Sequence, residues 1–373
     1  MAEALINKSV LQWAFDRAGN NNSLVSKFGK FQDYLSGKAK PTFIQAQDLA
    51  KALKIPFGYL FLDKPPLQTE IVPDLRTFDN QINTSLTLKT LLRDIKQKQE
   101  WYKDYIIENN EIGCSVVGKF SINSDFNEIC NDIISKFNII NLKRSDPKKY
   151  INNIIERAEE LKILIMGNSI LGSNTKNKLE IDEFRGFAIY DDIAPLIFIN
   201  KNDTLKAQIF TLFHEIAHLW IRESGISSIQ NVEIDNNIER FCNKIAAEVL
   251  MPKEVFINKF DKLNDDWLLN LEKKFCVSRL AILTRAKDLN LISNNEYKQY
   301  RDIELENIRV NLQNRRLKED FNIPHAVVIQ SKYGRLFSKA VVGAVLSEKE
   351  TYRSGAKLFG ETKTSIIDKL AKL

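Results

Sequence analysis

The sequence predicts a mainly helical α+β protein with a small mixed sheet. Most of its 373 residues fall into segments whose apolar side chains recur every three or four positions, which is the helical period. Three short runs, "ILIMGNSIL", "FRGFAIYD" and "PLIFIN", are rich in Ile, Phe and Leu and bounded by turn residues, which is typical of strands. Asp203 is the predicted N-cap of a helix that follows these strands. Apolar residues cover nearly the whole circumference of this helix, which predicts that it is buried: Ile209, Phe210, Leu212, Phe213, Ile216, Leu219 and Trp220.

The chain is long enough for several domains, and its pattern changes divide it into four. Residues 1–66 are expected to form a small helical domain that ends at a double proline. Residues 67–162 should form a helical connecting region, which begins with a long amphipathic helix over 86–110. Residues 163–262 hold the three strands and two helices, and 263–373 form a C-terminal helical region.

Composition excludes several classes of protein. No apolar run approaches the roughly 18 residues that cross a bilayer, and no basic segment followed by an apolar one opens the chain. A cytoplasmic protein without membrane contact is therefore expected. Four scattered cysteines without C-x-x-C spacing argue against a disulfide framework and against a thiolate zinc site. The net charge of +6 permits contact with nucleic acid without demanding it.

Two of the three histidines lie four positions apart in "HEIAH". On a helix, positions i and i+4 share a face, so His214 and His218 can aim at one ion. Glu215 between them matches the general base of H-E-x-x-H metallopeptidases, which deprotonates zinc-bound water. The alternative is a pair of core histidines. A metal site is favoured, because burying three unpaired polar groups is costly and because shuffled residues give this motif with a probability of only about 0.3%.

A catalytic zinc ion needs a third protein ligand and an open position for water. No further histidine follows at a suitable spacing, so a carboxylate is expected. The preferred candidate is Glu239, 21 positions after His218 and on a helix of its own. Asn243, one turn later, is predicted to hydrogen-bond a ligating histidine and fix its tautomer. A solvated acid is the alternative for Glu239 and for the weaker candidates Glu233, Asp235 and Glu248.

The segments "FTLFHEIAHLW" and "ERFCNKIAAEVLMP", with "EFRGFAIYDDIAPLIFIN" upstream, resemble the ImmA/IrrE family of metallopeptidases. The resemblance implies a zincin-like fold, one catalytic Zn²⁺ held by His214, His218 and Glu239, and Glu215 as the base. The segment "KPTFIQAQDLAKALKIPFGYLFLDKPP" resembles the Xre-type helix-turn-helix that often precedes this peptidase, and "PDLRTF" continues that pattern. The stretch between Gly19 and Gly37 is several residues too short for a full recognition helix. This degenerate module is therefore expected to bind protein or support the fold, with DNA binding as the alternative.

Members of this family act on DNA-binding repressors of bacteria and their mobile elements. The resemblance therefore implies a protein substrate, expected to be a repressor or a toxin-like partner, and control of stress, mobile-element or toxin–antitoxin genes. The competing interpretation is a non-catalytic transcriptional regulator or antitoxin-like binding protein with a structural zinc site.

Further residues are assigned roles around the predicted site. Tyr190 is the candidate second donor to a tetrahedral oxyanion. Gly186, Phe187 and Ala188 are predicted to form an edge strand along which an extended substrate adds. The third histidine, His325, is placed in a strand "HAVVIQ", where a structural role is favoured over an oxyanion role.

Helix-turn-helix-like spacing recurs in the C-terminal region. "LEKKFCVSRLAILTRAKDLNLIS" has such a pattern, and packing is its favoured role. In the tail, Ala356, Gly360 and Ile366 follow the i, i+4, i+10 spacing of a helix-turn-helix, with nearby lysines at 357, 363 and 369. Small helical hairpins produce this spacing readily, so packing is favoured and DNA contact is the alternative.

Overall fold

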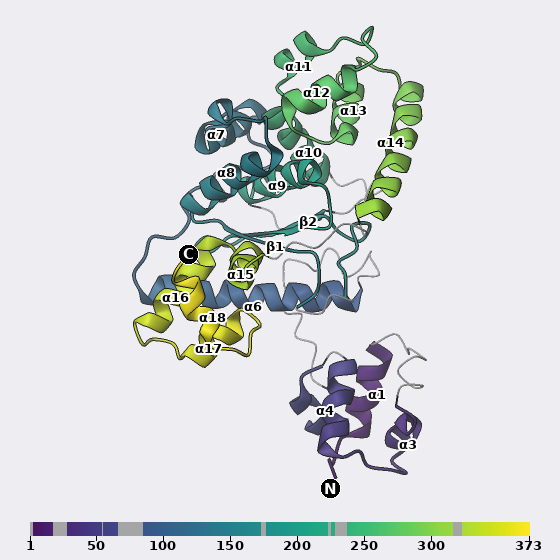
Figure 1. Cartoon of the computed structure of the whole chain (residues 1–373), viewed down its shortest axis with the longest axis vertical. Coiled ribbons are helices and arrows are strands. Elements are labelled where there is room, and N and C mark those ends of the chain that lie inside the picture. Colours follow the sequence, from purple (N-terminus) through teal and green to yellow (C-terminus); the bar gives the residue numbers. More distant parts are fainter. Residues whose placement is uncertain are drawn as a thin grey trace. The chain divides into compact units, whose positions relative to one another are not determined.

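A computed structural model describes residues 3–17, 28–53, 55–65, 85–172, 177–222, 225–227, 237–315 and 323–373. Over these residues the chain is mainly helical with one small mixed sheet, which confirms the predicted α+β class (Figure 1). It divides into two compact units, Met1–Asp94 and Ile95–Leu373. The helix α6 (Leu86–Glu108) crosses this division.

The first unit is a small helical cluster. A capping box starts its helix α4: the Thr42 hydroxyl accepts from the backbone N–H of Gln45, and the Gln45 side chain accepts from that of Thr42. Residues 18–27 of the predicted Xre-like domain (residues 1–66), and the "PDLRTF" (73–78) that continues its pattern, lie outside the described part of the chain. The helical elements described in this unit are α1 (Lys8–Arg17), α3 (Phe31–Ser36), α4 (Phe43–Ala52) and the 3-10 helix η1 (Phe57–Phe61).

The second unit contains the sheet, whose strand order is β1-β3-β2-β4. β1 pairs with β3 in parallel, whereas β2 runs antiparallel to both β3 and β4. The three predicted strands are confirmed. The fourth was not predicted, because three residues are too few to show a period. The bounds are β1 (Leu164–Asn168), β2 (Gly186–Ile189), β3 (Leu196–Asn200) and β4 (Gly225–Ser227).

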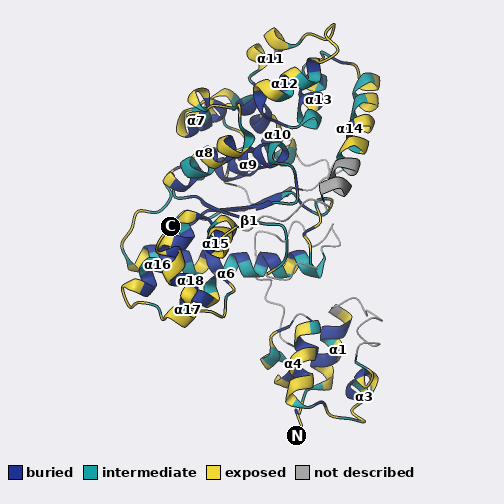
Figure 2. Ribbon diagram, viewed as in Figure 1, coloured by how far each residue is buried: buried dark blue, intermediate teal, exposed yellow. Residues whose placement is uncertain are grey.

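Helices cover both faces of the sheet, which explains why β1, β2 and β3 are almost wholly buried and apolar. On one face lie α8 (Pro147–Glu160) and α9 (Leu205–Trp220); on the other lie α15 (His325–Tyr333), α16 (Arg335–Leu346) and the α6 segment from Ile95 onward (Figure 1). The Gln99 side chain joins α6 to the connection between β2 and β3, since its amide donates to the Ala194 carbonyl at 2.7 Å. Burial is deepest in the sheet and in α9 (Figure 2).

The buried helix α9 begins one residue later than predicted. Thr204 is its N-cap and accepts from the Ala207 backbone N–H, whereas Asp203 forms an ion pair with Arg185 at 3.3 Å. Aromatic rings anchor α9 to α7 (Phe126–Phe137): the Phe137 ring centroid lies 5.6 Å from that of Phe213. α10 (Asn237–Leu250) packs along α9, so two neighbouring helices are available to build a site.

Helices also form most of the chain after α10. Their bounds are α11 (Lys253–Lys259), α12 (Trp267–Phe275), α13 (Arg279–Asp288), α14 (Asn294–Arg315), α17 (Tyr352–Leu358) and α18 (Ser365–Leu370), and a short 3-10 helix η3 (Ile139–Asn141) precedes α8. Among the described residues, no helix has the length and apolar character needed to cross a membrane.

The predicted strand around His325 is wrong, because this segment forms the helix α15. The β-branched pair in "HAVVIQ" suggested a strand. Burial instead follows Ala326, Ile329 and Tyr333, which is the i, i+3, i+7 spacing of a helix face.

Candidate metal centre

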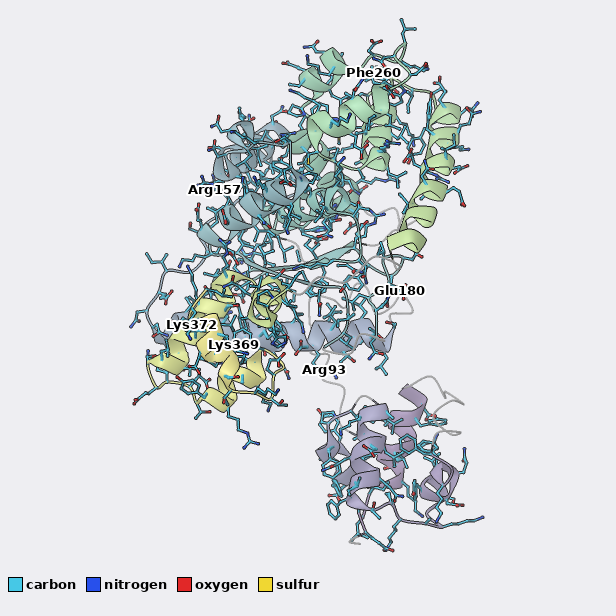
Figure 3. All side chains as sticks on the ribbon, viewed as in Figure 1. Arg93, Arg157, Glu180, Phe260, Lys369 and Lys372 are labelled. Atoms are coloured by element: carbon cyan, nitrogen blue, oxygen red, sulfur yellow. The ribbon has the colours of Figure 1, made fainter. Side chains whose placement is uncertain are left out.

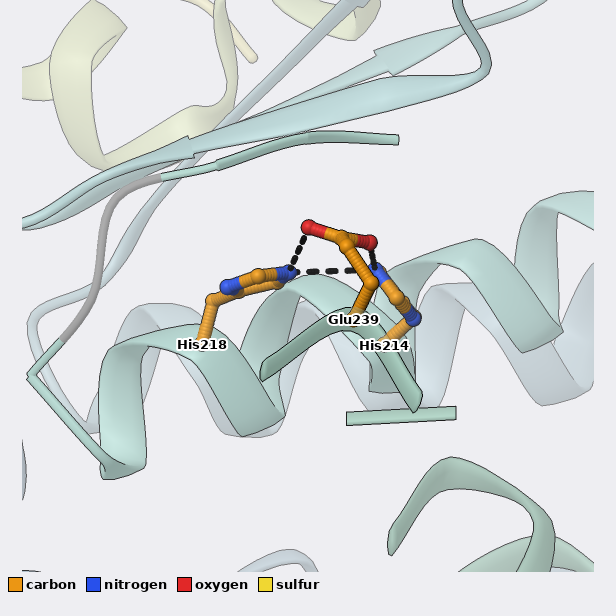
Figure 4. A group of neighbouring side chains, drawn as sticks. All are labelled: His214, His218 and Glu239. Carbon is orange, nitrogen blue, oxygen red and sulfur yellow. Dashed lines mark hydrogen bonds and ion pairs between the residues drawn. The ribbon is translucent and has the colours of Figure 1, made fainter. Parts of the chain in front are cut away.

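Two histidines and a glutamate converge between α9 and α10 (Figure 4). The Nε2 atoms of His214 and His218 lie 3.1 Å apart. One carboxylate oxygen of Glu239 lies 3.1 Å from the His214 Nε2, and the other lies 3.1 Å from the His218 Nε2. The sequence produces this arrangement because the histidines are one turn apart on α9, while Glu239 lies in the first turn of the adjacent α10.

The donor set fits a zinc ion. Imidazole nitrogen and carboxylate oxygen are the ligands of catalytic zinc, and tetrahedral ligands bonded at about 2.0–2.1 Å are about 3.3 Å apart. The three separations of 3.1 Å are close to that value. A search of the described residues for groups of three or more His, Cys, Asp or Glu side chains that could hold one metal ion finds His214, His218 and Glu239.

Electrostatics also favour a cation here. Burial opposes ionisation of Glu239, but hydrogen bonds from His214 and His218 outweigh it and lower the carboxyl pKa well below its usual range. Burial opposes protonation of His214, yet the hydrogen bond to Glu239 and the charges of Glu215 and Glu239 raise its pKa above the usual value. The carboxylate of Glu239 is therefore ionised, and its negative charge would stabilise a cation held between the three side chains.

Asn243 orients one of the imidazoles. It lies one turn after Glu239 on α10, and its side-chain oxygen is 3.0 Å from the Nδ1 of His214. When Nδ1–H donates to this oxygen, the lone pair of Nε2 points at the shared centre. The structure thus places Asn243 in the contact that the sequence predicted for it.

Glu215 follows His214 directly in the chain, and its carboxylate lies beside β2. Its side chain is fully buried. A Cβ added to Gly186 would lie 3.2 Å from the Glu215 Oε1, 2.8 Å from the Thr211 Cγ2 and 2.9 Å from the Phe198 carbonyl oxygen. The missing side chain of Gly186 therefore allows β2 to lie directly against α9 at the position of Glu215.

Replacing Gly186 by alanine is expected to displace Glu215 or β2. Overpacking of this kind costs about 1–3 kcal/mol, so the melting temperature should fall by about 2–10 °C. Gly58→Ala is the matched control, since a Cβ at Gly58 meets nothing within 4 Å. Differential scanning fluorimetry of both variants measures the shift. Equal melting temperatures for Gly186→Ala and the unchanged protein would contradict the proposed contact.

The expected edge strand at Gly186, Phe187 and Ala188 is wrong. β2 has β3 on one side, and β4 pairs with these same three residues on the other. The chain returns to the sheet after α9 and adds β4 outside β2 in the strand order. The backbone hydrogen-bonding groups that an incoming substrate strand would need are therefore already used.

The hydroxyl of Tyr190 donates to Asp192, and the guanidinium of Arg222 lies 5.1 Å from the centre of its ring. Burial and the hydrogen bond to Asp192 raise the pKa of Tyr190 to about 12, so the phenol stays protonated at neutral pH. An oxyanion role would require the bond to Asp192 to break, and this role stays a prediction.

The sequence offers three other acids as candidates for the third ligand, and it contains one further histidine. Glu248 forms an ion pair with Arg285 and accepts from the Lys253 backbone N–H at 3.0 Å, so its carboxylate is engaged away from the imidazoles. Glu233 and Asp235 lie outside the described residues. His325 is largely exposed and pairs with Glu361 at 3.3 Å, which is a surface contact within the C-terminal helices.

A buried helix carrying H-E-x-x-H, a glutamate on the next helix and a small mixed sheet against them define a metallopeptidase-type domain. The family model of peptidase M78, described as the IrrE N-terminal-like domain, matches residues 158–287. This segment is therefore similar to the IrrE N-terminal-like domain, which confirms the resemblance of its peptidase motifs to that family, and it includes His214, His218 and Glu239. Searches of the curated proteins and of the solved structures found no match.

Proposed function

We propose that the protein is a zinc-dependent endopeptidase that cleaves a DNA-binding repressor or another regulatory partner protein, and so controls bacterial stress, mobile-element or toxin–antitoxin genes. The observation that carries this proposal is the convergence of His214, His218 and Glu239 beside the buried Glu215. The M78 family match supports metallopeptidase chemistry. The choice of substrate rests on the resemblance to ImmA/IrrE proteins.

His214, His218 and Glu239 are the residues that would hold Zn²⁺, which when bound acts as a Lewis acid and lowers the pKa of water. Asn243 keeps the His214 ring in the orientation that presents Nε2. Glu215 takes a proton as general base and returns it to the leaving amine. Its complete burial limits competition from bulk water for that proton.

Cleavage of candidate substrates tests this proposal. The zinc-loaded protein is incubated with the purified products of neighbouring genes, and fragments are identified by intact-mass spectrometry. We expect one DNA-binding regulator to be cut at a defined bond, with cutting abolished by 1,10-phenanthroline. Stoichiometric inhibition of a partner without fragments, unchanged in His214→Ala, would instead support a non-catalytic antitoxin-like role and overturn the proposal.

A further inference from the structure

The positive charge of the chain is concentrated near its C-terminus. Residues 323–373 contain nine Lys or Arg and four Asp or Glu, a net charge of +5, whereas the whole chain carries +6. None of the residues that form the metal centre lies in this segment. Its charge therefore calls for a separate explanation.

The helices α16, α17 and α18 pack on one another. Ala356, Phe359 and Ile366 are buried between them, and Gly360 adopts a φ of +71° in the turn, a conformation that suits glycine. A Cβ on Gly355 would lie 2.5 Å from the Val345 Cγ2, so α17 and α16 are in close contact. Ala356, Gly360 and Ile366, whose spacing was noted in the sequence, thus lie where α17 and α18 pack on the neighbouring helices.

α17 and α18 contact mainly the neighbouring helices. α15 and α16 pack on β1, while α17 and α18 pack chiefly on α15, α16 and each other (Figure 1). Four exposed lysines lie on α17, on α18 and beside them: Lys357, Lys363, Lys369 and Lys372 (the last two labelled in Figure 3). We call these four residues the basic face.

Three of the four acids in the C-terminal segment contact groups other than the four lysines. Glu361 pairs with His325, Glu350 accepts from the Trp101 indole, and Asp368 accepts from the Tyr352 hydroxyl at 3.4 Å. Within the described part of the chain, no ion pair involves any of the four lysines. Exposed hydroxyl groups accompany them at Thr362, Thr364 and Ser365, and Lys and Ser/Thr side chains are common phosphate ligands.

We propose that the basic face binds double-stranded DNA through its phosphates. The helix α18 is short, six residues, and buries Ile366, Ile367 and Leu370, so few of its side chains are left to read base edges. Binding is therefore mainly electrostatic and weakly dependent on sequence. This site is independent of the metal centre and would place the peptidase domain on DNA, where DNA-bound regulators are found.

Fluorescence anisotropy with a labelled random duplex of about 30 base pairs, in about 50–200 mM salt, tests the proposal. The full chain carrying Glu215→Gln is used, so that binding is measured apart from any peptidase activity. We expect log affinity to fall linearly with log salt, with a slope of about −2 to −4 if two to four phosphates are neutralised. Changing all four lysines of the basic face to Gln should weaken binding at least about tenfold and flatten that slope.

The matched control changes four exposed lysines elsewhere in the same unit, Lys148, Lys149, Lys273 and Lys274, to Gln. It removes the same charge and should retain most of the affinity. Circular dichroism checks that each variant is folded. The proposal is overturned by absence of binding at the lowest salt, by equal losses in both quadruple variants, or by capture of an acidic polypeptide but not of duplex DNA.

Discussion

Replacing Glu215 by glutamine is expected to abolish peptide cleavage while zinc binding is retained. The amide has nearly the same shape and keeps an oxygen, but it cannot accept the proton that the reaction must move. Loss of a general base lowers kcat by about 10²–10⁴-fold. Cleavage of the regulator identified with the unchanged protein, followed by mass spectrometry, measures this loss, and metal content is determined on the same sample.

Glu215→Asp provides a graded control, because it keeps a carboxylate but withdraws it by one methylene. Partial activity in that variant and none in Glu215→Gln would support the assignment. Full activity in Glu215→Gln would refute the assignment of Glu215 as the base without affecting the metal site.

Replacing Glu239 by alanine is expected to remove metal from the protein. Only two imidazoles would then remain. Loss of a residue that merely hydrogen-bonds a ligand lowers metal affinity by about 10–100-fold. Loss of the ligand itself should therefore lower metal affinity by more than about 100-fold. Metal bound to the folded state stabilises it, so a chelator should lower the melting temperature of the unchanged protein. The same chelator should leave Glu239→Ala unaffected, which thermal unfolding with and without 1,10-phenanthroline measures.

Glu254→Ala is the control for this experiment, since it removes an exposed acid from the neighbouring helix α11. It should respond to the chelator as the unchanged protein does. An equal chelator response in Glu239→Ala would show that the third ligand is another residue.

Much of the metal centre could be predicted from the sequence because its spacing is local. His214 and His218 are one helical turn apart, and so are Glu239 and Asn243 on α10. Once α9 and α10 pack together, these two local periods fix which side chains face each other. The strands β1, β2 and β3 were also predictable, since their apolar runs are short and bounded by turn residues.

What was missed depends on contacts between distant segments. The contact of Gly186 with Glu215 arises only when β2 lies on α9, and no local pattern shows it. The edge position of β2 was wrong because β4 is too short to be seen in the sequence. The strand predicted at His325 was wrong because Val327 and Val328 are β-branched and favour strands, whereas the buried Ala326, Ile329 and Tyr333 follow the i, i+3, i+7 spacing of a helix.

The metal content of the purified protein tests the central claim most directly. Inductively coupled plasma mass spectrometry is applied to protein purified without added metal, alongside the double variant His214→Ala/His218→Ala prepared in the same way. We expect the unchanged chain to carry about one zinc ion, as a single site with this donor set implies, and the double variant to carry none. Equal zinc content in the two proteins, whether high or low, would contradict the account.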